Sequence, residues 1–326
     1  MLITGANIGL GFEAAIKFAA LGASALILGV RSIERGEAAK AEISKRANYP
    51  AEKIQLFSLD MAQFSSVEAF AKAVSGKVDQ IDVAVLNAGI AAPSYKLSPD
   101  GYETTLQVNA LSTALLGLLL LPKLREATAK SGAASHLTLV GSVGHHFVKP
   151  ETMVVEQGQS ILEKVNAKEF FGLGQYMVTK LLLMYAMDGI VAQTQVVDGQ
   201  PDVIVTTVCP SLCRSNLGRD FSSILKIPNA LFQMVFARSS EEGSRTIVSG
   251  AALDADAHGQ FWSHDVLFKY ALQLEQFWYE LTESDSRKGI MVTSDEGKKL
   301  QAKAWAEIVG VLSQRVPAVN SILRAK

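Results

Sequence analysis

One tyrosine and one lysine stand four residues apart in an apolar stretch, residues 171–184 (FGLGQYMVTKLLLM). A helix brings positions i and i+4 onto one face, so Tyr176 and Lys180 would lie side by side. A cation beside a phenol favours the phenolate and lowers the pKa of the phenol. Such a tyrosine is a better proton donor near neutral pH, and the pair is therefore a candidate acid–base centre.

The spacing alone does not identify this pair, because the chain holds a second Tyr-x-x-x-Lys match, Tyr49 and Lys53. Pro50 directly follows that tyrosine and disfavours a helix there. The rest of the sequence must therefore decide between the two pairs.

The composition predicts a large α/β protein with a sizeable core, because 48% of the 326 residues are hydrophobic and 19% are charged. A formal net charge of −1 gives no sign of a nucleic-acid partner. Two cysteines, Cys209 and Cys213, are too few for a disulfide framework or a zinc site, so we predict no metal. Free thiols indicate a reducing compartment, and we expect a cytoplasmic protein without a secretory signal.

The longest apolar stretch, residues 110–122, is shorter than the roughly 20 residues that cross a bilayer. We expect a core or subunit-interface helix there and no transmembrane segment. A mean hydropathy of +0.20 is compatible with peripheral membrane contact or with an apolar pocket.

Short apolar segments alternate with longer amphipathic ones along the whole chain. Candidate strands lie at residues 2–4, 24–30, 53–60, 81–89, 136–142, 202–210 and 259–264. This alternation predicts βαβ units and a parallel sheet. The expected fold is a single doubly wound Rossmann-fold domain over residues 1–326, with about seven strands in the order 3-2-1-4-5-6-7 and helices on both faces. The first strand is short for a central strand, so we expect further residues upstream of Met1.

A glycine-rich loop, TGANIGLG at residues 4–11, follows the first candidate strand and opens a helix. Glycine permits a tight turn and close approach to a pyrophosphate, which the helix N-terminus favours. The loop predicts dinucleotide contacts from Gly5, Asn7, Ile8, Gly9, Leu10 and Gly11.

The second candidate strand ends in LGVRS, which has no carboxylate for a ribose 2′-hydroxyl. Arg31 stands there instead, and a guanidinium suits a 2′-phosphate, so the sequence favours NADPH over NADH. The alternative is that Arg31 is a solvated surface charge.

Six motifs in register resemble the short-chain dehydrogenase/reductase family over nearly the whole chain. They are the glycine loop, Asp60 in SLDMA, NAG at Asn87, Ala88 and Gly89, Asn109 in QVNAL, Ser142 in VGSVG, and YMVTK with Tyr176 and Lys180. A looser resemblance, in SSEEGSRTIVSGA, GQFWSHD and SDEGKKLQAKAW, is to fungal members related to retinol dehydrogenases, many of them in natural-product pathways.

The resemblance implies a catalytic role for four residues. Ser142 would hydrogen-bond the substrate carbonyl oxygen, and Tyr176 would pass a proton to it as hydride arrives. Lys180 would bind the nicotinamide ribose, and Asn109 would help to hold a water that relays protons to the lysine. Two hydroxyl donors aimed at one oxygen stabilise the charge that develops there in the transition state.

The resemblance also implies further cofactor contacts. Asp60, with Met61 beside it, would contact the adenine amine, and Asn87, Ala88 and Gly89 would line the adenine side. After the sixth strand the family usually has Pro-Gly followed by a threonine; this chain has Pro210, then Ser211, with Ser215 at the threonine position. Ser215 keeps a hydroxyl for the nicotinamide carboxamide, whereas Ser211 puts a side chain where backbone freedom is usual.

The region after the cofactor-binding part (about residues 1–200) is expected to hold the substrate. Residues 211–240 form an apolar candidate lid, and residues 265–326 extend beyond the minimal fold. The lid segment could equally pack on the core, or do both. Candidate pocket residues are Val143, His145, His146, Leu212 and Phe232.

Three functions fit these features. The leading hypothesis is an NADPH-dependent ketoreductase or alcohol dehydrogenase for a bulky apolar substrate of terpenoid or polyketide type. The second is isomerisation, dehydration or cyclisation without net redox chemistry, and the third is a non-catalytic dinucleotide-binding regulator. The apolar helices at 104–122 and 176–191 would either form a homodimer interface or be covered by the C-terminal segment.

Overall fold

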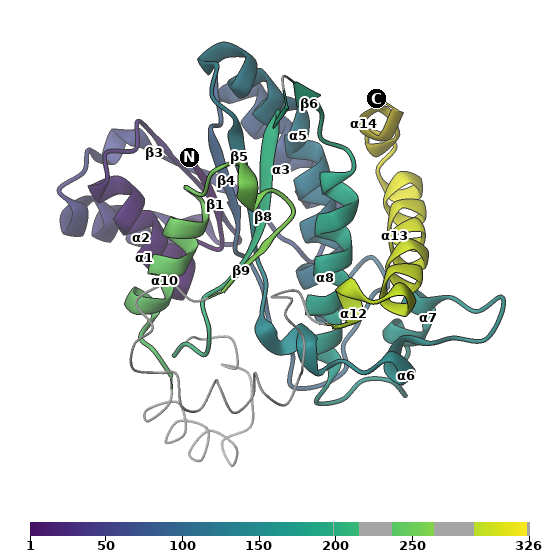
Figure 1. The fold of residues 1–326 in the computed structure, drawn as a ribbon. Coiled ribbons are helices and arrows are strands. Elements are labelled where there is room, and N and C mark those ends of the chain that lie inside the picture. The colour runs from purple at the N-terminus through teal and green to yellow at the C-terminus, as the bar shows by residue number, and fades with distance from the viewer. Residues whose placement is uncertain (198, 215–236, 264–289, 325–326) are drawn as a thin grey trace, which may run out of the picture.

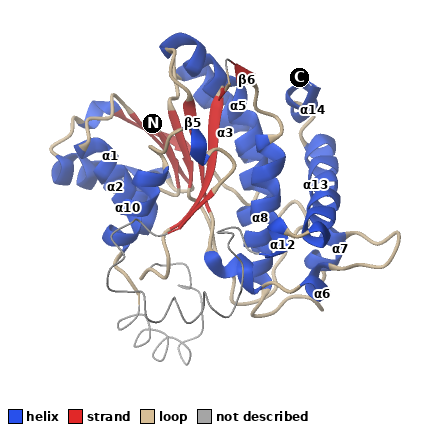
Figure 2. Cartoon of the chain, in the orientation of Figure 1, coloured by secondary structure: helices blue, strands red, loops and turns tan. Residues whose placement is uncertain are grey.

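A seven-stranded sheet forms the centre of the protein (Figures 1 and 2). The computed structural model describes residues 1–197, 199–214, 237–263 and 290–324. The strand order is β3-β2-β1-β4-β5-β8-β9, and the six strand pairings described in this sheet are parallel. The strands are β1 (Leu2–Thr4), β2 (Leu26–Val30), β3 (Ile54–Ser58), β4 (Val83–Leu86), β5 (Ser135–Val140), β8 (Val203–Cys209) and β9 (Phe261–Ser263). The predicted order is confirmed, since β8 and β9 are the sixth and seventh strands of this sheet.

Helices cover both faces of the sheet, which explains why its inner strands are apolar without alternation. Every residue of β2 and β8 is buried. Figure 1 shows α1 (Gly9–Ala20), α2 (Ile33–Ala47) and α10 (Ser240–Gly250) on one side. The other side carries α3 (Phe64–Lys77), α5 (Ser112–Ser131) and α8 (Gln175–Val191). Two separate hydrophobic clusters fill the spaces between helices and sheet.

The short strand β1 is extended by hydrogen bonds just outside it. Ile27 donates its backbone N–H to Met1, and Gly5 donates its own to Gly29. A two-stranded antiparallel pair, β6 (Val196–Val197) with β7 (Gln200–Pro201), lies outside the main sheet and was not expected from the sequence.

One long helix runs from Thr104 to Ser131 and contains α4 (Thr104–Leu106), a π-helix at Gln107–Leu111, and α5. By length and composition this helix could cross a membrane. However, 89% of its apolar 18-residue stretch is buried inside the protein. That burial is typical of a core helix, which is one of the two roles predicted for residues 110–122.

The C-terminal segment covers the helices that were candidates for a dimer interface. The described part consists of α12 (Ile290–Thr293), α13 (Asp295–Arg315) and α14 (Val319–Arg324). Helices α12 and α13 pack on α8, and α14 packs on α5, as Figure 1 shows in yellow. A Cβ placed on Gly189 of α8 would lie 2.2 Å from the Trp305 ring of α13, so the missing side chain makes room for the indole. Of the two alternatives for α5 and α8, coverage by the C-terminal segment is the one found.

Candidate active site

A cleft of about 920 Å³ opens at the carboxyl edge of the parallel strands, where ligands of such sheets bind. The loops after β1, β2, β3, β4, β5 and β8 line it, together with the start of α8. The predicted site residues that line it are Gly5, Asn7, Ile8, Gly9, Leu10, Arg31, Asp60, Met61, Asn87, Ala88, Gly89, Ser142, Val143, Tyr176, Lys180, Pro210 and Leu212. Gly11, Asn109, His145 and His146 lie behind this lining, and Ser215 and Phe232 fall outside the described residues.

The glycine loop has the shape that close approach to a phosphate requires. Gly5 and Gly9 have φ of 66° and 64°, which side-chain-bearing residues rarely adopt. The residue that precedes α1, Ile8, makes no side-chain capping bond, and the first turn of α1 has no acidic residue. The first backbone N–H groups of α1 therefore suit the diphosphate of a dinucleotide.

Asn87 holds this loop against β4. Its Nδ2 donates to the backbone oxygen of Thr4 at 2.9 Å, and its backbone N–H donates to the Thr4 hydroxyl at 3.0 Å. A Cβ on Gly11 would lie 2.4 Å from the Asn87 amide nitrogen, so Gly11 makes room for that amide. The structure thus gives Asn87 and Gly11 a bracing role that the sequence did not predict, with Thr4 as their partner.

A basic corner lies where the 2′ position of the adenosine ribose is expected. Arg31, Ser32 and Arg35 all line the cleft, and Ser32 caps α2 by accepting the Arg35 N–H at 3.2 Å. Within the described residues, neither arginine has an ion pair. Sequence reasoning missed Arg35, although its position four residues after Arg31 was a signal. The carboxylate of Asp60 lies at the same cleft and accepts hydrogen bonds from Ala62 and Gln63.

Three of the four predicted catalytic residues meet at the other end of the cleft. Ser142 follows β5 and caps a 3-10 helix, Val143–Phe147, by accepting the Gly144 N–H at 3.1 Å. The Tyr176 phenol lies beside the Ser142 side chain, which acts to lower the pKa of the phenol. Lys180, one helical turn further along α8, lies with its Nζ 5.7 Å from the Tyr176 ring centroid and donates to the Val140 backbone oxygen at 2.7 Å.

Burial dominates the pKa values at this centre. It raises the pKa of Tyr176, the nearby Cys209 adds to the rise, and the Ser142 side chain opposes it. Burial also lowers the pKa of Lys180 to about 8. The sequence predicted that Lys180 would lower the tyrosine pKa. In the structure, desolvation of the phenol is the largest effect on its pKa and raises it, and the Lys180 amine donates to the Val140 backbone oxygen, so a lowering of the tyrosine pKa by Lys180 stays a prediction.

Asn109 lies in the π-helix and is 1% exposed. Its Oδ1 accepts the Ile90 N–H at 2.9 Å, and its Nδ2 donates to the Ile90 oxygen at 2.8 Å and the Thr179 hydroxyl at 3.2 Å. A Cβ on Gly89 would meet both Asn109 Oδ1 and Lys180 Nζ, at 3.3 and 3.8 Å. The side chain is therefore close to the lysine, and its part in a proton relay stays a prediction.

The two histidines after Ser142 do not line the cleft. His145 is fully buried, its Nδ1 lies 2.6 Å from the Ser142 backbone oxygen, and its ring packs edge-on against Phe261. His146 packs against the His145 ring at 4.3 Å between centroids. The rings of both histidines pack near Phe261, and contact with substrate stays a prediction. Phe147 of the same turn lines the cleft instead.

Both cysteines are buried, form no disulfide with each other and line the cleft. Cys209 Sγ accepts backbone N–H groups of Val143 at 3.2 Å and Ser211 at 3.4 Å, and burial raises the pKa of Cys213 to about 12. Ser211 has a φ of 63°, which confirms that this position of the loop normally suits glycine. No cluster of three or more potential metal ligands occurs among the residues that the structure describes.

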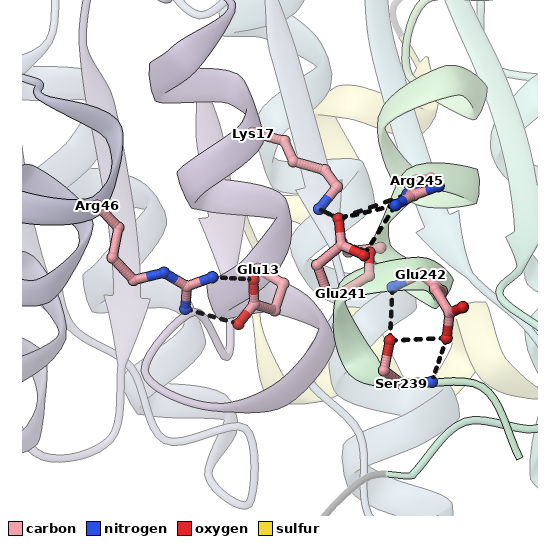
Figure 3. A network of polar contacts seen from close by, with 8 residues as sticks. Glu13, Lys17, Arg46, Ser239, Glu241, Glu242 and Arg245 are labelled. Atoms are coloured by element: carbon pink, nitrogen blue, oxygen red, sulfur yellow. Dashed lines mark hydrogen bonds and ion pairs between the residues drawn. The ribbon is translucent and has the colours of Figure 1, made fainter.

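A polar network joins the helices next to the glycine loop (Figure 3). Lys17 of α1 pairs with Glu241 of α10 at 2.7 Å, and Glu241 also pairs with Arg245. Glu13 of α1 pairs with Arg46 of α2 at 2.8 Å. The network fixes α10, which begins with a capping box of Ser239 and Glu242, beside the helix that presents the loop.

Comparison with known proteins agrees with this geometry. Residues 1–143 match a family model described as short chain dehydrogenase. The short-chain dehydrogenase/reductase ffsI of Aspergillus flavipes is 47% identical over 324 residues, 99% of this chain and 88% of that protein. The short-chain dehydrogenase/reductase phmF of Phaeosphaeria nodorum is 46% identical, over 99% of this chain and 89% of that protein.

Solved structures share the fold at low identity. A short-chain dehydrogenase from Sphingobium yanoikuyae in complex with NADPH matches with a TM-score of 0.56 at 18% identity, over 86% of this chain and 92% of that one. An NADH-dependent reductase, A1-R′, responsible for alginate metabolism matches with a TM-score of 0.57 at 20% identity, over 81% of this chain and 94% of that one. With its close relatives aligned over almost their whole length, the chain belongs to the short-chain dehydrogenase/reductase family and is an oxidoreductase of alcohol and carbonyl groups.

Proposed function

We propose that this protein is an NADPH-dependent ketoreductase, or an alcohol dehydrogenase in the reverse direction, for a bulky apolar ketone or secondary alcohol. The observation that carries the proposal is one cleft with a basic corner, Arg31 and Arg35, at one end and the Ser142–Tyr176–Lys180 centre at the other. This arrangement suits a 2′-phosphorylated dinucleotide lying along the strand ends.

The residues at the centre fit carbonyl reduction. A nicotinamide cofactor would supply the hydride, and the protein would supply position and protons. A substrate oxygen beside Ser142 and Tyr176 would accept two hydrogen bonds that strengthen as negative charge develops on it. The tyrosine would then give its proton to that oxygen, and the buried Lys180 ammonium would stabilise the phenolate left behind. Loss of one such donor costs on the order of 3 kcal/mol of transition-state stabilisation.

The cleft lining supports an apolar substrate. Among the described lining residues that follow β4 in the chain, Lys180 is the only charged side chain. Phe147 and Leu212 line the cleft while 53% and 46% exposed, an arrangement that suits contact with a large apolar ligand. A terpenoid- or polyketide-like ketone is the class that we propose, and a cytoplasmic location stays a prediction.

Cofactor choice is tested by titrating the purified protein with NADPH and with NADH. We expect tighter binding of NADPH, and Arg31→Ala and Arg35→Ala should each weaken it about tenfold or more while leaving NADH binding nearly unchanged. Arg46→Ala is the matched control. Arg46 lies on α2, as Arg35 does, but it pairs with Glu13, and neither residue of that pair lines the cleft. Equal losses for both cofactors, or tighter NADH binding, would contradict the NADPH assignment.

Turnover is tested with a panel of apolar cyclic ketones. We expect consumption of NADPH in step with alcohol formation, and a loss of at least 100-fold in kcat with Tyr176→Phe. Products that form without NADPH consumption would instead support chemistry without net redox. Full activity of Tyr176→Phe would contradict the proposed role of the phenol.

A further inference from the structure

A fully buried carboxylate, Glu103, caps the long helix that carries Asn109. Its side chain accepts the backbone N–H groups of Thr105 and Leu106, both at 2.9 Å. A carboxylate suits this place, because the helix N-terminus presents unpaired N–H groups and a partial positive charge. These two bonds alone would explain a cap, but Glu103 has a third donor.

That donor is the side chain of Gln175, the first residue of α8. Gln175 is 3% exposed, and its Nε2 donates to Glu103 Oε2 at 2.8 Å and to the Val165 oxygen at 3.3 Å. Both neighbours are acceptors, so the amide must turn its NH₂ towards them. Its Oε1 is then buried without a hydrogen-bond partner among the described residues.

An unsatisfied buried acceptor is unfavourable for folding, and a methionine of similar length would avoid it. The amide therefore does something that an apolar side chain cannot do. It joins the first residue of α8 to the cap of the neighbouring helix, across 72 positions of sequence.

The joined helices carry the catalytic residues. Tyr176 directly follows Gln175 on α8, and Asn109 follows Glu103 on the long helix. A second polar link, from Asn109 Nδ2 to the Thr179 hydroxyl at 3.2 Å, joins the same helices about one turn further along. The Thr179 hydroxyl in turn donates to the Tyr176 backbone oxygen at 2.7 Å. The turn that begins with Tyr176 is thus held at both ends.

We propose that Glu103 and Gln175 form a positioning pair that sets the rotation of the first turn of α8 and thereby aims the Tyr176 phenol at Ser142. The effect of this pair on kcat rests on the proposed function, whereas its effect on the position of the Tyr176 phenol does not. Asn166 completes the arrangement, because its Oδ1 accepts the Glu103 backbone N–H at 2.6 Å and fixes the cap from α7 (Ile161–Asn166).

The test is Gln175→Met, which keeps the length of the side chain and removes both N–H bonds. Gln193→Met, two residues beyond the other end of α8, is the matched control, since its side-chain amide donates to the Gly189 backbone oxygen of α8 and joins no second helix in the described part of the chain. Each variant is assayed for the reduction of decalone, an apolar bicyclic ketone, by NADPH. Gln175→Met should lower kcat about tenfold or more, in keeping with the cost of small misplacements, and leave KM for NADPH and the melting temperature near their original values. Gln193→Met should leave kcat unchanged.

Two outcomes would overturn the pairing. One is an unchanged kcat in Gln175→Met; the other is an equal loss in both variants, which would indicate a general effect on α8. Wild-type protein that reduces no ketone would count against the proposed function instead. Crystal structures of the two variants then show where the Tyr176 phenol lies relative to Ser142, and this test does not depend on a measurement of activity. The Tyr176 phenol should move away from the Ser142 hydroxyl in Gln175→Met and keep its wild-type position in Gln193→Met, and an unmoved phenol in both variants would contradict the pair's role.

Discussion

Lys180 places a cation where burial disfavours charge. It is 5% exposed, and burial lowers its pKa from 10.5 to about 8. The unfolded chain therefore binds more protons than the folded protein between these values, so this group makes stability rise as pH increases from about 8 to 10.5. Below pH 8 the folded protein retains the full cost of the buried ammonium, roughly 3 kcal/mol. The role that we propose for Lys180 in catalysis would account for this cost.

Lys180→Met should accordingly abolish activity while raising the free energy of unfolding at pH 7. We expect a gain of about 2 kcal/mol, since the lost hydrogen bond to Val140 offsets about 1 kcal/mol. Chemical unfolding at pH 7 and at pH 10 measures the gain, which should shrink at the higher pH. The exposed Lys130→Met serves as control and should show no such trend. A gain that does not change with pH would refute a charge-burial origin.

Ser211 holds a left-handed backbone conformation, with φ of 63°, beside the cleft. For a residue with a Cβ this conformation costs roughly 1–2 kcal/mol, and glycine avoids it at an entropic cost of about 0.5–1 kcal/mol. Ser211→Gly should therefore stabilise the protein by up to about 1 kcal/mol, as measured by denaturant unfolding. Ser211→Ala keeps the Cβ and should give no gain; an equal gain in both variants would locate the effect in the hydroxyl group.

The candidate catalytic residues could be located from the sequence because motifs fix residue type and spacing locally, and their catalytic roles stay a prediction. Ser142, Tyr176 and Lys180 meet as expected. The direction of the tyrosine pKa could not be predicted, since burial depends on the whole fold. Gln175 was missed for a related reason: its partner, Glu103, is distant in sequence and belongs to no motif.

At the scale of the elements, α13 docks on α8 through a pair of complementary shapes. The Trp305 ring occupies the space that a side chain at Gly189 would need. Around this contact, Gln301 donates to Asp188 at 2.9 Å, and the Tyr185 hydroxyl donates to the Met291 oxygen at 3.0 Å. Alanine normally stabilises a helix by about 1 kcal/mol relative to glycine. A decrease in the free energy of unfolding on replacing Gly189 by alanine would therefore indicate that the contact with Trp305 is tight.

Gly189→Ala should destabilise the protein by about 1–3 kcal/mol, because its Cβ would lie 2.2 Å from a rigid ring. Gly310→Ala on α13, where a Cβ meets nothing within 4 Å, should instead stabilise it slightly. The melting temperatures of both variants show whether each substitution stabilises or destabilises the protein. Combining Gly189→Ala with Trp305→Ala should cost less than the sum of the single changes, whereas additive costs would show that the two residues do not interact.

The strands could be predicted from the alternation of apolar and amphipathic segments, and their order from the Rossmann fold that the family resemblance implies. The π-helix at Gln107–Leu111 and the fit of Trp305 over Gly189 could not. Both arise from contacts between elements rather than from local pattern. The sequence around a helical glycine does not reveal whether an aromatic ring or water covers it.

For the whole molecule, the C-terminal helices cover apolar surfaces that could otherwise contact a second copy of the chain. Helix α8 is buried at 13 of its 17 positions, and α13 and α12 supply part of that cover. Helix α14 covers α5 in the same way. With both helices covered from within the chain, a homodimer through them would first require these C-terminal helices to leave.

We therefore expect the wild-type protein to be a monomer in solution, by light scattering coupled to size-exclusion chromatography. Trp305→Asp should weaken the docking of α13 and expose the face of α8 around Gly189 and Tyr185. Exposed apolar area of this kind favours association, so this variant should self-associate as its concentration rises. Gly310→Ala should stay monomeric. A wild-type dimer whose stability is unaffected by Trp305→Asp would place the subunit contact on a different face of the molecule.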